Sequence, residues 1–347
     1  MNEKKLEEWK RKRLNRKKSL DHDQLLKGIL AGNIQALSSS ITLLESAHTS
    51  DQKIARDIVN SCIPHAGKSV RVGVTGVPGV GKSTFIESFG QFVVSKGHKI
   101  AVLAIDPSSE RSGGSILGDK TRMQQLSQSK KAFIRPSAAG KSLGGVARKT
   151  REAIILCEAA GFDYILIETV GVGQSETVVH SMVDFFLLLM LAGAGDELQG
   201  IKRGIMEMAD ALVITKADGD NVLNAKKARV QYKNALHLFP PSKNQWIPKV
   251  LIASAYENFN IDGIFDVIDS FHNHTSINGS FEHKRMEQDK YWLHETIADA
   301  LMVSFYGDED IQAEIKSIEE DIKNRRISSF HGAEKLLSIY QAKQRRK

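Results

Sequence analysis

The stretch "VRVGVTGVPGVGKST", Val70 to Thr84, joins an apolar run to a glycine-rich loop that ends in Lys-Ser-Thr. The β-branched residues of "VRVGVTG" predict a buried strand, and the pattern from Lys82 onward predicts a helix. Between them lies G-x-x-x-x-G-K-[ST], in which backbone N–H groups converge on phosphate oxygens at a helix N-terminus. The stretch therefore predicts an α/β fold that binds a nucleoside triphosphate.

Each residue of the loop and the first helical turn is expected to contact the nucleotide phosphates. Lys82 would reach the β- and γ-phosphates, and the Ser83 hydroxyl would bind Mg²⁺. A chance glycine loop before a helix is the alternative, but the complete motif with a strand before it and a helix after it argues against chance. The other predicted contacts here are Gly76, Val77, Pro78, Gly79, Val80, Gly81 and Thr84.

Further apolar runs alternate with helical segments between residues 66 and 280. This alternation predicts a P-loop NTPase with a mostly parallel central sheet, covered by helices on both faces. The expected strands are "VRVGVTG", "KIAVLAID", "AFIRPSA", "YILIETVG", "FFLLLML", "ALVITKAD" and "KVLIASA".

The chain is predicted to have three parts. Residues 1–65 are read as an N-terminal helical extension, residues 66–280 as the nucleotide-binding (G) domain, and residues 281–347 as a C-terminal helical arm. In the arm, apolar residues such as Ile311, Ile315 and Ile318 recur at helical spacing. This spacing does not decide whether the arm packs on the core or on a second subunit.

The positive charge is concentrated at the two ends of the chain. The formal net charge is +7; residues 1–18 carry +6 and residues 343–347 carry +4, so the body is negative. Basic chain ends of this kind are more often solvated helix termini than nucleic-acid-binding segments, so we favour the first interpretation. With only two cysteines, no recognisable signal peptide and no apolar run of membrane length, we expect a cytoplasmic protein that does not associate with a membrane.

The motif "ITKADGD" ends a later strand and predicts a guanine site. Asp218 can accept from both N1–H and N2–H₂ of guanine, a pairing that adenine cannot match. The stem of Lys216 can lie along the base. The motif resembles N-K-x-D with Thr215 in place of Asn, and this change loses an amide expected to brace the loop and the base. A helix cap for the segment near Asn221 is the alternative role of Asp218.

A second strand end supports guanine. In "IASAYE", Ser254 and Ala255 resemble the short Ser-Ala element whose backbone N–H meets guanine O6, and Tyr256 follows them. Each element alone is weak because such pairs are common by chance. Together and in order they favour guanine over adenine, so GTP and GDP with Mg²⁺ are the expected ligands.

Three acidic residues fall where a Mg²⁺–triphosphate site needs oxygen ligands. Asp106 ends the second strand, Asp119 lies in the following loop, and Glu168 ends "YILIETVG". Because Mg²⁺ keeps several waters, Ser83 and one or two of these acids are expected to bind it directly. For Asp119 a helix N-cap before "KTRMQQL" is the alternative.

The segment "ETVGVGQSE" follows the same strand as Glu168. Gly171 would place a backbone N–H near the γ-phosphate, and either Gln174 or Glu176 could orient the attacking water. The predicted catalytic set is Lys82, Glu168, Asp106 and Gln174.

Several long motifs now resemble one known family. "GVTGVPGVGKST", "DPSSERSGGSILGDKTRM", "RPSAAGKSLGGVARKTREA", "ETVGVGQSE", "AGAGDELQGIKRGIMEMAD" and "TKADGD" look like the MeaB/ArgK-type GTPases, G3E-family members of the SIMIBI class. The resemblance implies a chaperone of a B12-dependent acyl-CoA mutase, by default methylmalonyl-CoA mutase. Its GTP cycle would gate adenosylcobalamin loading and protect the mutase.

The same resemblance implies further properties. It predicts a homodimer joined partly by the C-terminal arm, GTP hydrolysis that is slow until the partner stimulates it, and metal-site roles for Asp106, Asp119 and Glu168. It also identifies "LAGAGDELQGIKRG", from Leu191 to Gly204, as a third switch.

The composition of this third segment fits a switch that exchanges partners. Its glycines permit motion and its charged side chains can form alternative contacts, although an ordinary surface loop would have the same composition. The residues expected to report the nucleotide state to a partner are Asp196, Glu197, Gln199, Lys202 and Arg203.

A metallochaperone GTPase that delivers a transition metal is the main alternative function. Such a protein needs clustered Cys and His ligands, and "SCIPHAG" supplies Cys62 and His65. A buried cysteine at a helix end beside a solvent-facing histidine is the favoured interpretation of this pair. His272 and His274 lie two positions apart on a helix, so their rings diverge.

Overall fold

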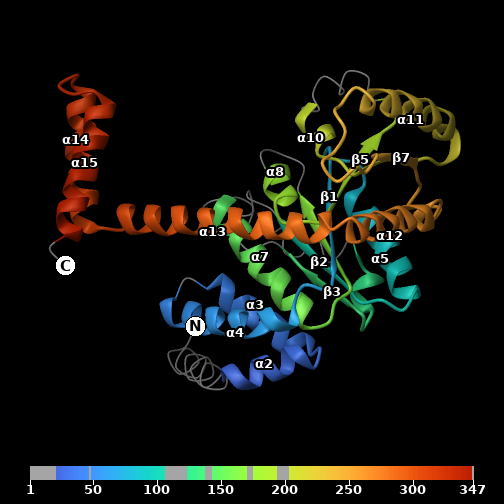
Figure 1. Cartoon of the computed structure of the whole chain (residues 1–347), viewed down its shortest axis with the longest axis horizontal. Helices are drawn as coiled ribbons and strands as arrows, with labels where there is room; N and C mark the ends of the chain where they lie inside the picture. The colour runs from blue at the N-terminus through green and yellow to red at the C-terminus, as the bar shows by residue number, and fades with distance from the viewer. Residues whose placement is uncertain are drawn as a thin grey trace, which may run out of the picture. The chain divides into compact units, whose positions relative to one another are not determined.

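A parallel sheet of seven strands forms the centre of the protein (Figure 1), as the apolar runs predict. The computed structural model describes residues 21–46, 48–105, 123–136, 143–169, 175–193 and 203–345. The strand order is β3-β2-β4-β1-β5-β6-β7. The strands are β1 (Val70–Gly76), β2 (Ile100–Ile105), β3 (Ala132–Arg135), β4 (Tyr164–Thr169), β5 (Phe185–Leu191), β6 (Ala211–Thr215) and β7 (Lys249–Ile252).

Helices connect the strands because neighbouring parallel strands cannot be joined by tight hairpins. Within the sheet region the helices are α5 (Lys82–Ser95), α7 (Leu143–Ala159), α8 (Ser175–His180), α10 (Arg203–Glu207), α11 (Val222–Leu236) and α12 (Ile261–Ile277). The helices before and after this region are α2 (His22–Leu30), α3 (Ile34–Glu45), α4 (Thr49–Cys62), α13 (Ser280–Tyr306), α14 (Glu309–Lys323) and α15 (Ser329–Gln344).

The two faces of the sheet have different helical covers. Phe89 of α5 and Phe271 of α12 pack in one core with Val72 of β1. Side chains alternate along a strand, so the next residue, Gly73, faces the other side, where it meets Val179 of α8. Helices α7 and α11 contact strands on this second side. Burial on both faces explains why the strands are continuous apolar runs.

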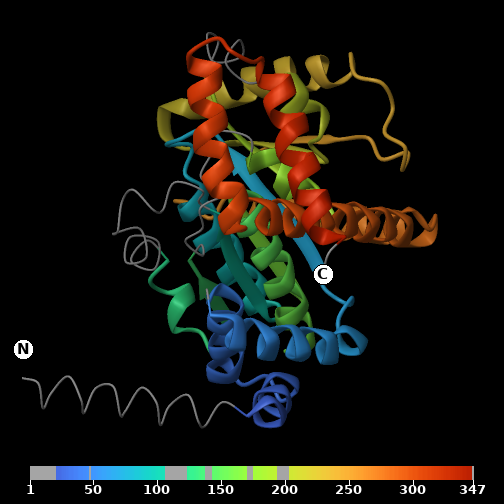
Figure 2. The same cartoon turned by 90° about the vertical axis from the view of Figure 1, so that its left-hand side faces the viewer.

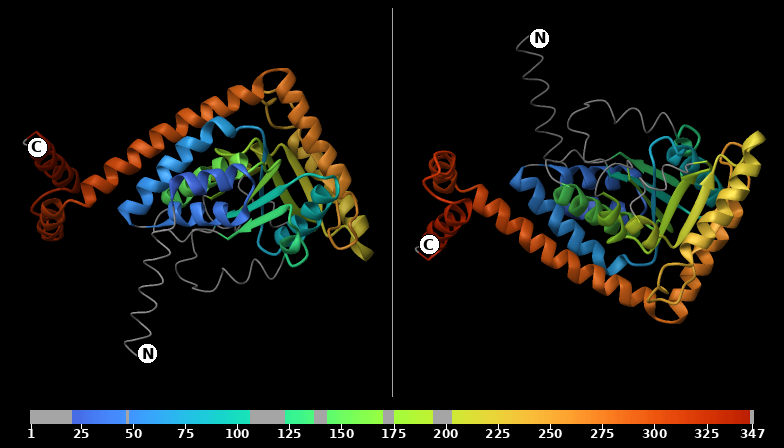
Figure 3. Two further views of the ribbon diagram at one scale, coloured as in Figure 1. Left: turned by 90° about the horizontal axis from the view of Figure 1, so that it is seen from below. Right: turned by 90° about the horizontal axis from the view of Figure 1, so that it is seen from above.

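The helices α2, α3 and α4 pack against one another and against α7, and Figure 3 shows them (blue) beside α7 (green). The amphipathic pattern of the N-terminal region produces this layer, with Leu37 and Ile41 of α3 and Ile58 of α4 fully buried. Asn33 caps α3 by accepting from two backbone N–H groups.

The amino ends of β1 and β5 hold a buried network of charges. Arg71 of β1 forms two hydrogen bonds with Glu158 of α7, both 2.9 Å. Arg285 of α13 forms two with Asp184, at 2.9 and 2.7 Å, and donates to the carbonyls of Gly67 and Ser69. Such pairing satisfies charges that are costly to bury alone. The network fixes the first turns of α13 to the sheet.

The chain divides after Gln288 into two compact units, and α13 crosses this boundary. In the second unit, α14 and α15 lie side by side (Figure 2). Asp308 caps α14 and pairs with Lys343 of α15 at 2.8 Å. Within the described residues, no helix combines the length and apolar character that crossing a membrane requires.

Candidate functional site

The predicted nucleotide-binding residues gather at the carboxyl edge of the sheet. Gly76 ends β1 at the centre, and Glu168 lies near the end of the neighbouring β4, paired in register with Val74. Thr215 ends β6, two strands from β1 on the other side. Ligands of open parallel sheets bind at this edge. The order of strands therefore brings the separate motifs to one place.

Two glycines give the phosphate-binding loop its shape. At Gly76, with φ +153°, a Cβ atom would lie 2.4 Å from the carbonyl oxygen of Leu189 in β5, so no other residue fits. Gly81 has φ +96° immediately before α5 begins. Val80, between them, is fully buried and anchors the loop, whereas Pro78 and Thr84 are exposed. The loop thus presents the N-terminus of α5 to the site.

Lys82 folds back over the loop as the first residue of α5. Its Nζ donates to the carbonyl of Gly76 at 2.8 Å and to that of Val77 at 3.2 Å. Burial lowers the pKa of Lys82, while the charges of Glu168 and Glu176 oppose this change. The two buried carboxylates favour the ammonium form, which is the form that a phosphate needs.

Ser83 and Glu168 face each other across the position predicted for the metal. The Oγ of Ser83 donates to Oε1 of Glu168 over 3.4 Å. A hydroxyl and a carboxylate are the oxygen ligands that Mg²⁺ prefers, so these two residues fit the predicted ion. The other two predicted ligands, Asp106 and Asp119, lie outside the described residues.

Sequence reasoning missed a pair of hydroxyls beside this position. Thr75 of β1 and Thr169 of β4 are both buried, and their Oγ1 atoms are 2.8 Å apart. The bond ties the ends of the two strands that carry the phosphate-binding loop and Glu168. A signal was available, because each is a polar residue at the carboxyl end of an apolar strand.

Thr215 braces the phosphate-binding loop, contrary to the expectation that replacing Asn loses this support. Its Oγ1 lies 2.7 Å from the carbonyl of Val80 and 3.2 Å from that of Met190. A hydroxyl carries one proton and so donates to one of these oxygens at a time. Thr215 thus supports the loop, and its contact to the base stays a prediction.

Asp218 and Ser254 meet at the predicted guanine position. The Ser254 hydroxyl donates to Oδ2 of Asp218 at 2.5 Å, and Ser254 Oγ accepts from the backbone N–H of Glu257. Asp218 makes no side-chain cap bond to the short helix that follows it. The alternative role as a helix cap is therefore wrong. Its carboxylate is instead held by a residue from the second predicted motif.

The remaining residues of the two guanine motifs differ in exposure. Lys216 has a left-handed backbone, φ 55°, and its stem lies against Gly81. Ala255 is half-buried, and Tyr256 has 88% of its surface exposed. Nothing in the described structure holds Tyr256 toward the site, so its role stays a prediction.

Several predicted residues cannot be placed. Those of the two switch segments, Gly171, Gln174, Asp196, Glu197, Gln199 and Lys202, lie outside the described residues. Arg203 begins α10, but its side chain is not described. Glu176, the alternative to Gln174, is buried at the start of α8.

Within the described residues, the Cys and His side chains do not assemble a transition-metal site. Cys62 is buried at the end of α4 and burial raises its pKa to about 11, whereas His65 is exposed, as predicted. His272 packs edge-on against Phe281, and His274 bonds to the carbonyl of Asn244. In the described ranges no three His, Cys, Asp or Glu side chains are placed to share a metal ion.

A parallel sheet with this loop between β1 and α5 defines the class of P-loop NTPases. The family model described as methylmalonyl Co-A mutase-associated GTPase MeaB matches residues 37–310. The chain belongs to this family and is a GTPase that binds guanine nucleotides.

Individual relatives agree with this assignment. GTPase ArgK of Escherichia coli (strain K12) is 43% identical over 310 residues, which are 89% of this chain and 94% of that protein. The mitochondrial methylmalonic aciduria type A homolog of Mus musculus is 43% identical over 331 residues, 92% of this chain and 80% of that protein. The crystal structure of LAO/AO transport system kinase matches with a TM-score of 0.74 and 36% identity, over 92% of this chain and 97% of that one. The resemblance to the MeaB/ArgK-type GTPases and the α/β fold are thereby confirmed.

Proposed function

We propose that this GTPase is the chaperone of a B12-dependent acyl-CoA mutase, methylmalonyl-CoA mutase by default, and that its GTP cycle gates adenosylcobalamin loading and protects the mutase. The observation that carries the proposal is the match to a mutase-associated GTPase family over 37–310, together with the nucleotide site at the sheet edge. A metallochaperone role has no comparable support, because Cys62 and His65 diverge in exposure.

Magnesium binding is part of this proposal. Ser83 and Glu168 would hold the ion with Asp106, Asp119 or both completing the ligands. A bound Mg²⁺ supplies positive charge to the β- and γ-phosphate oxygens. The chain's own contribution would be to place Lys82 beside the same phosphates, where the charges of Glu168 and Glu176 oppose the lowering of its pKa by burial.

The arrangement of strands supports a nucleotide-dependent switch. The two predicted switch segments follow β4 and β5, and these strands flank β1 on either side. Leu189 of β5 is in register with Gly76, and Glu168 of β4 with Val74. Loss of the γ-phosphate would first change the contacts at the carboxyl ends of β4 and β5. Gly171 and Gln174 would sense it in one segment, and Asp196 to Arg203 would pass it to the mutase in the other.

The homodimer is also proposed. In the second unit, α13 exposes Leu293, Ile297 and Leu301, which are four residues apart and share one helix face. An exposed apolar stripe on a long helix is typical of a surface that packs against another chain. A cytoplasmic location stays a prediction, which the two buried free thiols support.

The test compares GTP turnover and cofactor transfer with and without purified methylmalonyl-CoA mutase. We expect the mutase to raise turnover about tenfold or more, since a partner that orders catalytic groups supplies a large part of transition-state stabilisation. Adenosylcobalamin should pass to the mutase only while GTP is hydrolysed. The absorption spectrum of the cofactor measures this transfer. Equal turnover in both conditions, with transfer that ignores the nucleotide, would contradict the proposal.

A further inference from the structure

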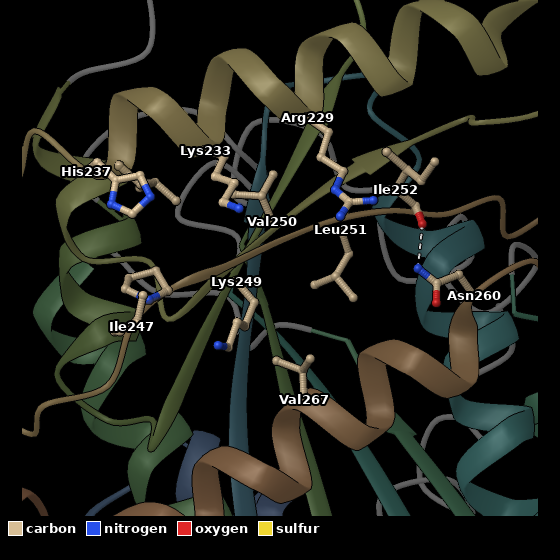
Figure 4. Close-up of a pocket in the computed structure, with 12 residues that line it drawn as sticks. Arg229, Lys233, His237, Ile247, Lys249, Val250, Leu251, Ile252, Asn260 and Val267 are labelled. Carbon is tan, nitrogen blue, oxygen red and sulfur yellow. Dashed lines mark hydrogen bonds between the residues drawn. The ribbon is translucent and has the colours of Figure 1, made fainter.

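A groove of about 490 Å³ runs along β7 (Figure 4). β7 is the last strand of the sheet in the described part of the chain, so its outer edge has no neighbouring strand there. Helix α11 stands on one side of this edge and α12 on the other. The groove thus has a strand edge as its floor and a helix as each wall.

The hydrogen bonds of β7 show which backbone groups face the groove. The N–H of Lys249 donates to the carbonyl of Asp210, the residue before β6, and the N–H of Ala253 donates to the carbonyl of Ile214 in β6. Alternate residues of a parallel strand point their backbone groups to the same side. Val250 and Ile252 therefore turn theirs outward, and the outward carbonyl of Ile252 accepts from Asn260 Nδ2 at 2.8 Å. The backbone at Val250 is in position to pair with an added strand.

The wall formed by α11 is basic. Arg229, Lys233 and His237 are spaced four residues apart, so they form one row along the helix, and all three are exposed. Lys249 adds a further cation at the start of β7. Among the residues that line the groove there is no carboxylate. The groove is therefore complementary to an acidic ligand.

The opposite wall and the end of the groove are apolar. Val267 of α12 and Leu251 of β7 are half-buried, and Ile247 keeps 65% of its surface exposed. Side chains of a strand laid along β7 would alternate between the α11 wall and the α12 wall. The two walls therefore select a segment in which acidic and apolar residues alternate.

We infer that the β7 groove binds an extended acidic segment of a partner protein, which joins the sheet beside β7. Main-chain hydrogen bonds at Val250 would supply affinity, and the basic row on α11 would supply selectivity for acidic side chains. Lysines on an edge strand also discourage pairing between copies of the same chain, which favours a different, acidic partner. The inference rests on no property of the nucleotide site.

The probe is a fluorescent synthetic peptide of alternating valine and glutamate, titrated with the full-length protein and followed by anisotropy. Saturable binding is expected, and a peptide with lysine replacing glutamate should not bind. Methylating the backbone nitrogens along one edge of the valine–glutamate peptide should abolish binding, because it removes the donors that strand pairing needs.

Substitutions on α11 and β7 test whether the peptide binds in the β7 groove. Arg229→Glu with Lys233→Glu should weaken peptide binding about tenfold or more, since both attractive charges become repulsive. Lys226→Glu with Lys227→Glu, exposed on the same helix but outside the groove, should change it by about twofold at most because those charges are screened. Val250→Pro should also weaken binding, as it removes the outward N–H without touching a bond to β6. GTP turnover of all these variants should equal that of the wild type.

Four results would overturn the inference. The first is that the acidic peptide shows no saturable binding. The second is that the control pair on α11 weakens binding as much as the groove pair. The third is that the methylated peptide binds unchanged, which would indicate a simple charge contact without strand pairing. Edge-to-edge dimers of the protein that Val250→Pro dissociates would likewise assign the edge to a second copy and exclude an acidic partner.

Discussion

The hydroxyl of Thr215 donates to the carbonyl of Val80 across 2.7 Å, and so joins the end of β6 to the phosphate-binding loop. The two residues are 135 positions apart in the chain. One of them belongs to the predicted guanine motif and the other to the predicted phosphate motif. The bond therefore links the predicted guanine motif to the predicted phosphate-binding loop through a single buried side chain.

Replacing Thr215 by valine should loosen this coupling. Leaving the buried Val80 carbonyl without this donor costs about 1–3 kcal/mol, and we expect GTP affinity to fall about tenfold as the loop loses its brace. Calorimetric titration with GTP measures the change. Thr215→Ser keeps the hydroxyl and should bind as the wild type does. If valine and serine variants bind equally, the hydroxyl does not brace the loop.

Asp218→Asn should change which base the protein prefers. In the proposed site the carboxylate would accept two N–H groups of guanine, whereas an amide presents one acceptor and one donor. We expect GTP affinity to fall at least about tenfold and xanthosine triphosphate, which carries a carbonyl where guanine has its amino group, to gain affinity. Competition titrations against a labelled nucleotide measure both. Ser254→Ala, which removes only the group that holds Asp218, should lower GTP affinity less and leave xanthosine triphosphate unimproved.

Glu168→Gln should raise the Mg²⁺ concentration needed for GTP turnover. The amide can still accept from Ser83, but the negative charge beside the proposed ion position and beside Lys82 is lost. We expect the half-saturating Mg²⁺ concentration to rise about tenfold, because hard divalent cations depend on carboxylate charge. Turnover measured across a Mg²⁺ titration checks this. Binding of GDP in the absence of Mg²⁺ serves as the control and should persist in the variant. An unchanged Mg²⁺ dependence of turnover would show that Glu168 does not belong to the metal site.

His180 should make the protein less stable in mild acid. Burial, together with the charge of Lys284, lowers the pKa of His180 from 6.5 to about 4. Between these values the unfolded chain takes up a proton that the folded protein does not, so the free energy of unfolding falls as the pH falls from about 6.5 to about 4. His180→Phe removes this dependence and keeps an aromatic ring against Phe186. Urea unfolding at a series of pH values should show a shallower slope for the variant, and equal slopes would contradict the assignment.

The sequence predicts this fold well because its signals are local. Each strand is an apolar run closed by turn residues, and the loop before Lys82 is one continuous motif, so all seven strands are confirmed. The interpretation of Cys62 as buried and His65 as exposed is confirmed for the same reason, since helical spacing sets which residues face inward.

Contacts between distant segments were harder to predict. The brace from Thr215 and the bond from Ser254 to Asp218 depend on strand order, which no single motif contains. The groove beside β7 depends on where α11 and α12 stand around an edge strand. The roles of Asp106, Asp119 and the switch residues stay predictions, because they lie outside the described residues.

The pair formed by Arg285 and Asp184 was also missed, and it leads to a prediction about stability. Burial alone would raise the pKa of Asp184, but the hydrogen bonds and the charge of Arg285 outweigh burial and hold that pKa below its usual range. The carboxylate is therefore charged inside the protein and depends on its partner. Arg285→Met removes this ion pair, leaves the backbone N–H of Arg71 as a donor to Asp184, and should lower the free energy of unfolding by about 3–5 kcal/mol.

The control for Arg285→Met uses the same substitution at an exposed ion pair. Arg326 pairs with Asp321 at 3.1 Å, but 69% of the Arg326 side chain is exposed. Because solvent screens such a pair, Arg326→Met should change the free energy of unfolding by less than about 1 kcal/mol. Urea denaturation of both variants at neutral pH makes the comparison.

A double variant, Arg285→Met with Asp184→Asn, should recover part of the loss in the free energy of unfolding, since it removes the uncompensated charge. If the double variant is as unstable as the sum of its two single variants, the pair is not the source of the stability, and the bonds from Arg285 to Gly67 and Ser69 must hold α13 on the sheet instead.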